Sequence, residues 1–346
     1  MKHFWMSLVF LPLALIAEEP QPKVKSAEEI HAELKADQEK FDRALKLFNP
    51  WYTGPLVTPS ATMMPPGDVN FQPYLNVQTN YAQFNEDRHS VTTPNLVQLQ
   101  SQNVLQTGLT DWMDALLFLQ GQESWLLDKN GGGYGDTQFG LGWQILAQGL
   151  YIPKIKVTIK ETFPTGRYKR LSPTGLGLDG VGAGTYATQF CLAFGKLLFW
   201  ATEHPVNTRL FLGYTVGTTV HVADTNFYGG VPGTLGKVRP GNQFAADLGI
   251  EWSASQAWVL AMDIVYSCAD RTTFYGNPGV TAAGLPAVVG FGSSDNLSLA
   301  PAFEYNWNSN IGIVCGVQFS VYGRNSANFA TGQFSVCWNF EPTTKF

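Results

Sequence analysis

The sequence is poor in charge for its length. Asp, Glu, Lys and Arg make up only 14% of its 346 residues, whereas about 25% is usual for soluble globular domains. No run of Lys or Arg occurs and the formal net charge is -5, which excludes a basic nucleic-acid-binding surface. Such a composition is typical of a chain whose outer surface is not fully exposed to water.

Cysteine is also scarce. Cys191, Cys268, Cys315 and Cys337 fall in separate predicted strands, without a CxxC pair or a Cys/His spacing suited to a metal. By strand parity, Cys191 and Cys337 face one way and the other two face the opposite way. We interpret all four as small wall residues rather than disulfides, and we predict no metal site and no cofactor.

Long apolar runs are missing beyond the N-terminus, so the roughly 18 apolar residues that a membrane-spanning helix requires are not reached. The chain begins MKHFWMSLVFLPLALIAEEPQPK, in which Lys2 and His3 precede an apolar run over residues 4–16. The small Ala17 follows this run. The pattern is typical of a secretory signal peptide, so we predict export, with residues 1–17 removed by cleavage near Ala17.

Residues 18–48 contain the one convincing helical pattern. In SAEEIHAELKADQEKFDRALKLF, residues 26–48, Ser26 and Glu29 fit a capping box. An apolar stripe at helical spacing follows, formed by Ile30, Leu34, Phe41, Leu45 and Phe48. We expect a short periplasmic amphipathic helix that packs on its own protein. The alternative is that residues 26–48 bind a periplasmic partner or form a homo-oligomer.

Residues 49–68, NPWYTGPLVTPSATMMPPGD, are too rich in proline for regular structure and are predicted to form an extended connector. From Val69 the pattern changes to period two. In NLSLAPAFEYNWNSNIGIVCGVQFSVYG, residues 296–323, one face is continuously apolar. The other face carries small and polar residues and ends with Tyr322. Residues 341–346 are a C-terminal tail.

The alternation predicts twelve strands between residues 69 and 340. They cover approximately residues 69–84, 93–108, 111–121, 136–146, 150–163, 182–199, 207–222, 243–253, 257–269, 295–307, 310–322 and 330–340. The connections after the even-numbered strands are mostly tight, and those after the odd-numbered strands are mostly long. Short turns at one end, long loops at the other and an even strand count are typical of an up-and-down antiparallel transmembrane β-barrel.

This all-β fold places the chain in the bacterial outer membrane, because lipid satisfies no backbone hydrogen bonds and requires a closed sheet. A soluble β-sandwich is the alternative, but its outer face would carry many Lys and Glu residues. Aromatic residues near the short turns indicate a girdle at the interface with outer-membrane lipid. Its members are Trp112, Tyr151, Trp200, Trp252, Trp258, Trp307, Trp338 and Phe340.

Parity turns several charged side chains toward the lumen. The basic ones gather on one sector of the wall and the acidic ones on the next. These candidates are Lys154, Lys156, Lys160, Arg209, Asp247, Glu251, Asp263 and Glu304. They form either a polarised constriction that orients a dipolar solute, or pairs of lysines with carboxylates that close a filled lumen.

Residues 134–168, YGDTQFGLGWQILAQGLYIPKIKVTIKETFPTGRY, resemble a known family. The matching features are the Gly135-Asp136 pair, Gly140 with Trp143, and Pro164-Thr165-Gly166 after an apolar strand. The preceding turn over residues 108–111 also fits. The segment is similar to outer-membrane barrels of the MetA-pathway-of-phenol-degradation family, which is related to hydrophobic-compound transporters. The likeness covers roughly residues 105–220. It implies passive uptake of small, often aromatic, compounds.

No arrangement of nucleophile, base and orienting group is evident, and no P-loop or dinucleotide fingerprint occurs. We therefore predict that the chain is not an enzyme. The leading hypothesis is a porin-like channel for the transport of small, hydrophobic or aromatic solutes. The alternative is a structural or adhesive barrel with a closed lumen, which binds partners through its helix and loops.

Overall fold

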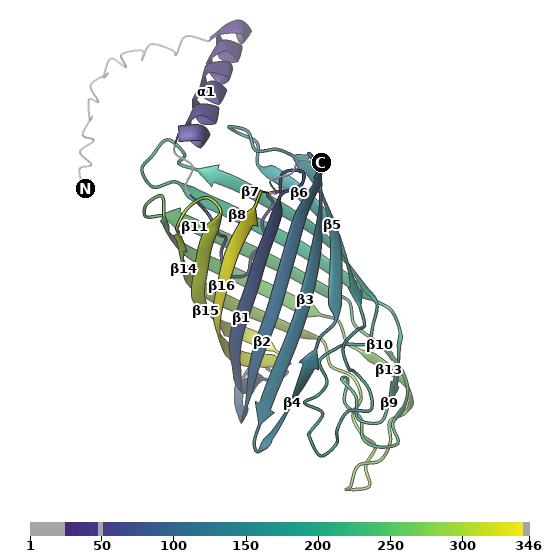
Figure 1. Ribbon diagram of the computed structural model, residues 1–346. Helices are drawn as coiled ribbons and strands as arrows, with labels where there is room; N and C mark the ends of the chain where they lie inside the picture. Colours follow the sequence, from purple (N-terminus) through teal and green to yellow (C-terminus); the bar gives the residue numbers. More distant parts are fainter. Residues whose placement is uncertain (1–24, 48–50, 342–346) are drawn as a thin grey trace, which may run out of the picture.

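Each barrel strand pairs with the strands that precede and follow it around the ring (Figure 1). The computed structural model describes residues 25–47 and 51–341, so the predicted signal peptide lies outside the described residues, as do Phe48 of the predicted apolar stripe and residues 342–346 of the predicted tail. Helix α1 covers Ala27–Leu47. The barrel strands are β1 (Val69–Phe84), β2 (Ser90–Thr110), β3 (Met113–Leu126), β5 (Thr137–Leu146), β6 (Lys154–Phe163), β7 (Ala187–Leu198), β8 (Val206–Gly217), β11 (Gln243–Ser253), β12 (Trp258–Ala269), β14 (Ser294–Asn306), β15 (Ile311–Arg324) and β16 (Ser326–Phe340).

The barrel closes where its first strand meets its last. Strand β1 pairs antiparallel with β16, from Val69 opposite Phe340 to Phe84 opposite Ser326. On its other side β1 pairs with β2, and β2 pairs with β3. Closure satisfies the backbone of every barrel strand from both sides and leaves no open edge. The predicted twelve-stranded up-and-down antiparallel barrel is confirmed.

The long-loop end contains structure that the alternation did not predict. Strand β4 (Lys129–Tyr134) folds back on the extended end of β3 as a hairpin. A separate three-stranded sheet forms from β9 (Val220–Ala223), β10 (Leu235–Arg239) and β13 (Thr273–Asn277). The predicted strand over residues 207–222 is thus too long, because β8 ends at Gly217 and the chain enters this second sheet.

The predicted lumenal and outer faces of β14 are confirmed along the strand. Ser298, Ala300 and Glu304 are buried inside, whereas Phe303 is exposed on the outside. Tyr322 of β15 is an exception. A register shift places Tyr322 opposite Leu297 and Ser320 opposite Ser298, so one extra residue reverses the side chains beyond it. Tyr322 is therefore 51% exposed rather than lumenal, with the Arg88 guanidinium above its ring.

Helix α1 lies at the short-turn end of the barrel (Figure 1). The predicted capping box at its start is confirmed. The backbone nitrogen of Ser26 donates to Glu29 Oε2 at 2.8 Å, and that of Glu29 donates to Ser26 Oγ at 3.2 Å. None of the helical structure that the model describes is long and apolar enough to span a membrane.

Candidate functional site in the barrel lumen

Residues 51–66, which we term the lumenal connector, enter the barrel at its short-turn end. The carbonyl oxygen of Trp51 accepts a hydrogen bond from Asn306 Nδ2 at 2.9 Å, at the rim end of β14. The hydroxyl of Tyr52 accepts one from Ser253 Oγ at 2.9 Å, at the end of β11. The connector was predicted to be extended and it has no regular structure, but its place inside the barrel was not predicted.

Two buried carboxylates hold the descending part of the connector. Glu304 Oε2 accepts the backbone N–H groups of Thr53 at 2.7 Å and Gly54 at 3.3 Å. Asp263 accepts those of Val57 at 3.0 Å and Thr58 at 3.2 Å, together with the Thr58 hydroxyl. Both carboxylates are fully buried. Hydrogen bonds to a charged acceptor contribute about 1.5–3 kcal/mol each, so these contacts hold the connector firmly.

The connector then returns along the opposite wall. Asp263 lies in β12 about 16 Å along the strand from the rim residue Trp258, from a rise of about 3.3 Å per residue. On the other side of the lumen, Thr62 Oγ1 accepts from Lys154 Nζ at 2.5 Å, at the start of β6. Pro66 pairs with Gly108 near the end of β2. The connector therefore forms a loop that dips into the lumen and leaves at the same end.

Arg209 lies directly under the connector. Its Nε and Nη2 atoms donate to the two oxygens of Glu251 at 2.7 and 3.0 Å, in the neighbouring strand. Asn207 Nδ2 also donates to Glu251, at 2.6 Å. Gly54 has a φ of +117°, and a Cβ atom there would lie 3.2 Å from Arg209 Nη1. Only glycine fits both this backbone conformation and this close approach.

Lys156 has a partner that the sequence analysis missed. Its Nζ donates to Asp114 Oδ2 at 2.5 Å, and both side chains are buried. The same oxygen accepts from Gln106 Nε2 at 2.5 Å. Asp114 is the second residue of β3, in which polar and apolar residues alternate poorly. Asp114 lies at the same strand parity as Gln120 and Gln122. This shared parity could have placed its side chain on the lumenal face.

The structure thus corrects the expected charge pairing. A closed lumen was expected to pair the lysines with Asp247, Glu251, Asp263 or Glu304. Among the described residues, however, Lys156 pairs with Asp114, and Asp263 and Glu304 bind backbone N–H groups. Lys160 instead stands over the ring of Phe118, 4.9 Å from its centroid. Asp247 is buried, and its Oδ1 has no hydrogen-bond partner within the part of the chain described.

A cavity of about 410 Å³ adjoins the connector inside the barrel. Residues 53–60 form one side of it. Its wall is mixed in character: amide side chains come from β1, β2, β15 and β16, and apolar ones come from β3 and β8. The main contributors are Gln72, Asn76, Gln102, Gln318, Gln333, Leu116, Phe118, Phe211 and Lys160. The volume falls in the range of small-molecule sites in proteins.

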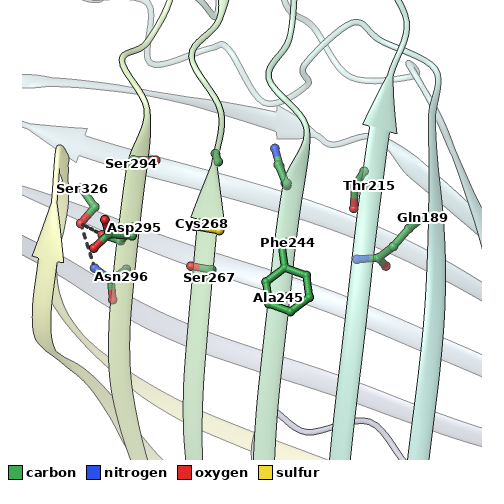
Figure 2. Close-up of a pocket in the computed structure, with 12 residues that line it drawn as sticks. Gln189, Thr215, Phe244, Ala245, Ser267, Cys268, Ser294, Asp295, Asn296 and Ser326 are labelled. Carbon is green, nitrogen blue, oxygen red and sulfur yellow. Dashed lines mark hydrogen bonds between the residues drawn. The ribbon is translucent and has the colours of Figure 1, made fainter.

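A second pocket of about 170 Å³ lies nearer the long loops (Figure 2). Gln189 and Thr215 flank it on β7 and β8, and Asp295, Asn296 and Ser326 on β14 and β16. Ser326 Oγ donates to the carbonyl oxygen of Asp295 at 2.8 Å. Because Gln189 lines both this pocket and the larger cavity, the two spaces adjoin within the barrel.

Asp136 gives a structural reason for part of the family-like motif. Its carboxylate is buried and accepts the backbone N–H groups of Gly166 at 2.9 Å and Ala183 at 2.8 Å. It thereby fixes both ends of the loop between β6 and β7. The hydroxyl of Tyr228 donates to the carbonyl oxygen of Ala183 at 2.8 Å, and burial raises the pKa of this phenol. The motif thus organises the long-loop end.

The eight girdle candidates all lie at the short-turn end. Seven of them present exposed rings, and Trp338 stacks on Phe340 with ring centroids 4.6 Å apart. Trp200 differs, because Phe41 of α1 packs edge-on against its ring at 5.2 Å. Gln38 Oε1 also accepts the backbone N–H of Leu150 at 3.0 Å. The helix therefore contacts two short turns of its own barrel, while Ile30 and Leu34 stay 45% and 42% exposed.

Within residues 25–47 and 51–341, no group of three or more His, Cys, Asp or Glu side chains is arranged to hold a metal ion. All four cysteines are free thiols in the structure.

Comparison with known proteins supports the fold. No family model matches the chain, and no curated protein matches it by sequence. Among solved structures, the COG4313 outer membrane channel from Pseudomonas putida F1 is similar, with a TM-score of 0.65 and 13% identity over 82% of this chain and 100% of that chain. The CymD monoaromatic hydrocarbon channel gives a TM-score of 0.39 at 10% identity, covering 81% and 90% of the two chains. The NanC porin gives 0.38 at 11% identity, covering 77% and 99%. The likeness to the COG4313 channel shows that the chain has the fold of an outer-membrane β-barrel.

Proposed function

We propose that the chain is a bacterial outer-membrane channel that passes small solutes passively, hydrophobic or aromatic compounds in particular. The observation that carries the proposal is the cavity beside the connector, inside a closed barrel. Amide groups together with Phe118 and Phe211 in its wall suit a solute with both a polar and an apolar part. The proposal includes no catalytic step.

The outer surface supports a membrane location. From Leu297 to Tyr305 of β14 the outward residues are apolar, and the charged Glu304 points inward. The closed ladder satisfies backbone groups that lipid cannot. Exposed Trp and Tyr rings at the short-turn end are suited to the interface between lipid and water. By analogy with other outer-membrane barrels, the short turns and α1 would face the periplasm.

The lumenal connector would control passage. It lies between the short-turn end and the cavity, so a solute that leaves the cavity in that direction must pass or displace it. Its anchors at Glu304 and Asp263 are hydrogen bonds to backbone N–H groups. These bonds are separate from the ladder hydrogen bonds that join β12, β14 and β15. Release of the connector would therefore open the lumen without breaking the barrel.

The same anchored connector also favours a second candidate function. A barrel whose lumen stays closed could serve as a structural or adhesive protein. The second sheet at the long-loop end, with a core of Val220, Val222, Tyr228 and Val238, would then provide a stable surface for partners. The two candidates differ in whether solutes ever pass.

Conductance in planar bilayers and swelling of proteoliposomes in L-arabinose test the channel. We would compare the mature chain with a variant in which a Gly-Ser linker of equal length replaces residues 51–66. The expected result is a small conductance for the native chain and a larger one for the variant, both with heat-modifiable folded barrels. If neither protein passes ions or arabinose, the channel proposal is wrong and the structural candidate remains.

A further inference from the structure

One cation in the cavity wall lacks an anionic partner. Of the inward basic side chains, Lys156 is paired with Asp114 and Arg209 with Glu251. Lys154 donates to Thr62, outside the cavity. Within the part of the chain described, the Lys160 ammonium makes no ion pair or hydrogen bond, and it lies over the face of Phe118. A partly buried charge without a counterion is unfavourable unless water or a ligand compensates it.

The surroundings of Lys160 are apolar on one side. The register places Gly140 of β5 between Leu116 of β3 and Lys160 of β6, so no side chain separates these two. Phe118 lies two residues further along β3 and faces the lumen as Leu116 does. Lys160, Leu116 and Phe118 therefore form one continuous part of the cavity wall, with a positive charge beside an apolar surface.

Neighbouring parts of the wall supply uncharged polar groups. Gln102 and Asn76 line the cavity together with Gln189, which is directly opposite Lys160 in the ladder between β6 and β7. The side-chain oxygens of Asn76 and Gln189 are buried without a hydrogen-bond partner in the described residues. These amides can bind water or a polar substituent, but they carry no charge to neutralise Lys160.

We infer that this cavity is a binding site for small aromatic monocarboxylates, with the carboxylate at Lys160 and the ring against Phe118 and Leu116. The inference rests on the proposed channel function and names a solute class for it. A carboxylate supplies the missing counterion through charge-assisted hydrogen bonds. The ring gains burial against apolar side chains and an aromatic contact with Phe118. A neutral aromatic would leave Lys160 uncompensated, and a small inorganic or aliphatic anion would leave the apolar wall uncovered.

Calorimetric titration of the purified, detergent-solubilised mature chain tests the inference with three probes. Benzoate has both groups, benzamide has the ring without the charge, and acetate has the charge without the ring. We expect benzoate to bind at least about tenfold more tightly than either, because each probe loses one of the two contacts. If benzamide or acetate binds as tightly as benzoate, or if benzoate does not bind, the inference is wrong.

Two lysine variants locate the site. In Lys160→Gln, benzoate affinity should fall about tenfold or more, while benzamide binding stays as it was. Lys169→Gln is the matched control, because the Lys169 ammonium also lies over an aromatic ring, that of Tyr168, but outside the cavity. It should leave benzoate affinity unchanged. Phe118→Ala should weaken benzoate and benzamide alike. Equal benzoate affinity in the native chain and in a folded Lys160→Gln variant would overturn the assignment.

Flux measurements separate this inference from the function on which it rests. If proteoliposomes pass arabinose but the calorimetric titration shows no preference for benzoate, the channel function is supported and the carboxylate site is rejected. Benzoate binding that depends on Lys160, in a protein that passes no solute, would support the site and reject the channel.

Discussion

Glu304 of β14 accepts the backbone N–H of Thr53 at 2.7 Å, and so joins the segment before the barrel to the interior of the barrel wall. Glu304 is fully buried, and its Oε2 also accepts the N–H of Gly54. No described helix or strand of the segment before Val69 enters the lumen, so such contacts, and not secondary structure, determine the position of the connector.

Glu304→Ala should therefore release the connector. It removes the acceptor of two backbone N–H groups, and each lost bond costs about 1.5–3 kcal/mol. We expect more frequent or larger channel openings in planar bilayers, and a barrel that remains folded. Asp247→Ala is the control, because Asp247 is another buried carboxylate and donates or accepts no hydrogen bond with the connector. An equal rise in conductance in both variants would contradict the role of Glu304.

Gly54→Val should act at the same place by a different route. Its φ of +117° is unfavourable for a β-branched residue, and its Cβ would press on Arg209. We expect increased conductance and faster protease cleavage within residues 51–66. Gly332→Ala is the matched control, because nothing lies within 4 Å of a Cβ there. If Gly54→Val behaves as Gly332→Ala does, the close approach to Arg209 has no consequence.

The strands could be predicted from the sequence because lipid and lumen impose a strict period of two on every strand. The same reasoning failed where that period is interrupted. A bulge turned Tyr322 outward, and the weak alternation of β3 concealed Asp114. The connector could not be placed at all, because Asp263 and Glu304 bind its backbone N–H groups, which every residue except proline possesses. Contacts of this kind leave no pattern in the side chains.

Substitution of adjacent residues in β15 tests the assigned faces. Val317 is exposed on the outer face near the middle of the strand, and Gln318 lines the lumenal cavity. Val317→Arg should lower the free energy of unfolding in lipid vesicles by about 2–4 kcal/mol, the cost of a charge near the bilayer midplane. Gln318→Arg should cost much less, because lumenal water can solvate it. Similar costs at both positions would show that the faces are wrongly assigned.

The buried pair of Asp114 and Lys156 gives a test by double-mutant cycle. Asp114→Ala or Lys156→Met alone leaves a buried charge without its partner, which costs about 3–5 kcal/mol. The double variant should recover part of that loss, because no uncompensated charge remains. Urea unfolding of the four proteins in vesicles measures the coupling energy. Strictly additive losses would mean that the contact of 2.5 Å contributes no coupling to the stability of the barrel.

Removal of α1 distinguishes the helix from the connector as the element that fills the lumen. The helix packs outside the barrel, through Phe41 on Trp200 and Gln38 on Leu150, whereas the anchors of the connector begin at Trp51. Deleting residues 18–48 should therefore leave a folded, heat-modifiable barrel whose conductance equals that of the native chain. Phe41→Ala should behave in the same way, because it only loosens the helix. The size of the detergent complex, measured by light scattering, should fall further than the lost mass if residues 26–48 also hold copies together. A large rise in conductance after the deletion would contradict this prediction and show that the helix itself restrains the connector. The hydrogen bonds at Glu304 and Asp263 would then be insufficient to keep the connector in the lumen.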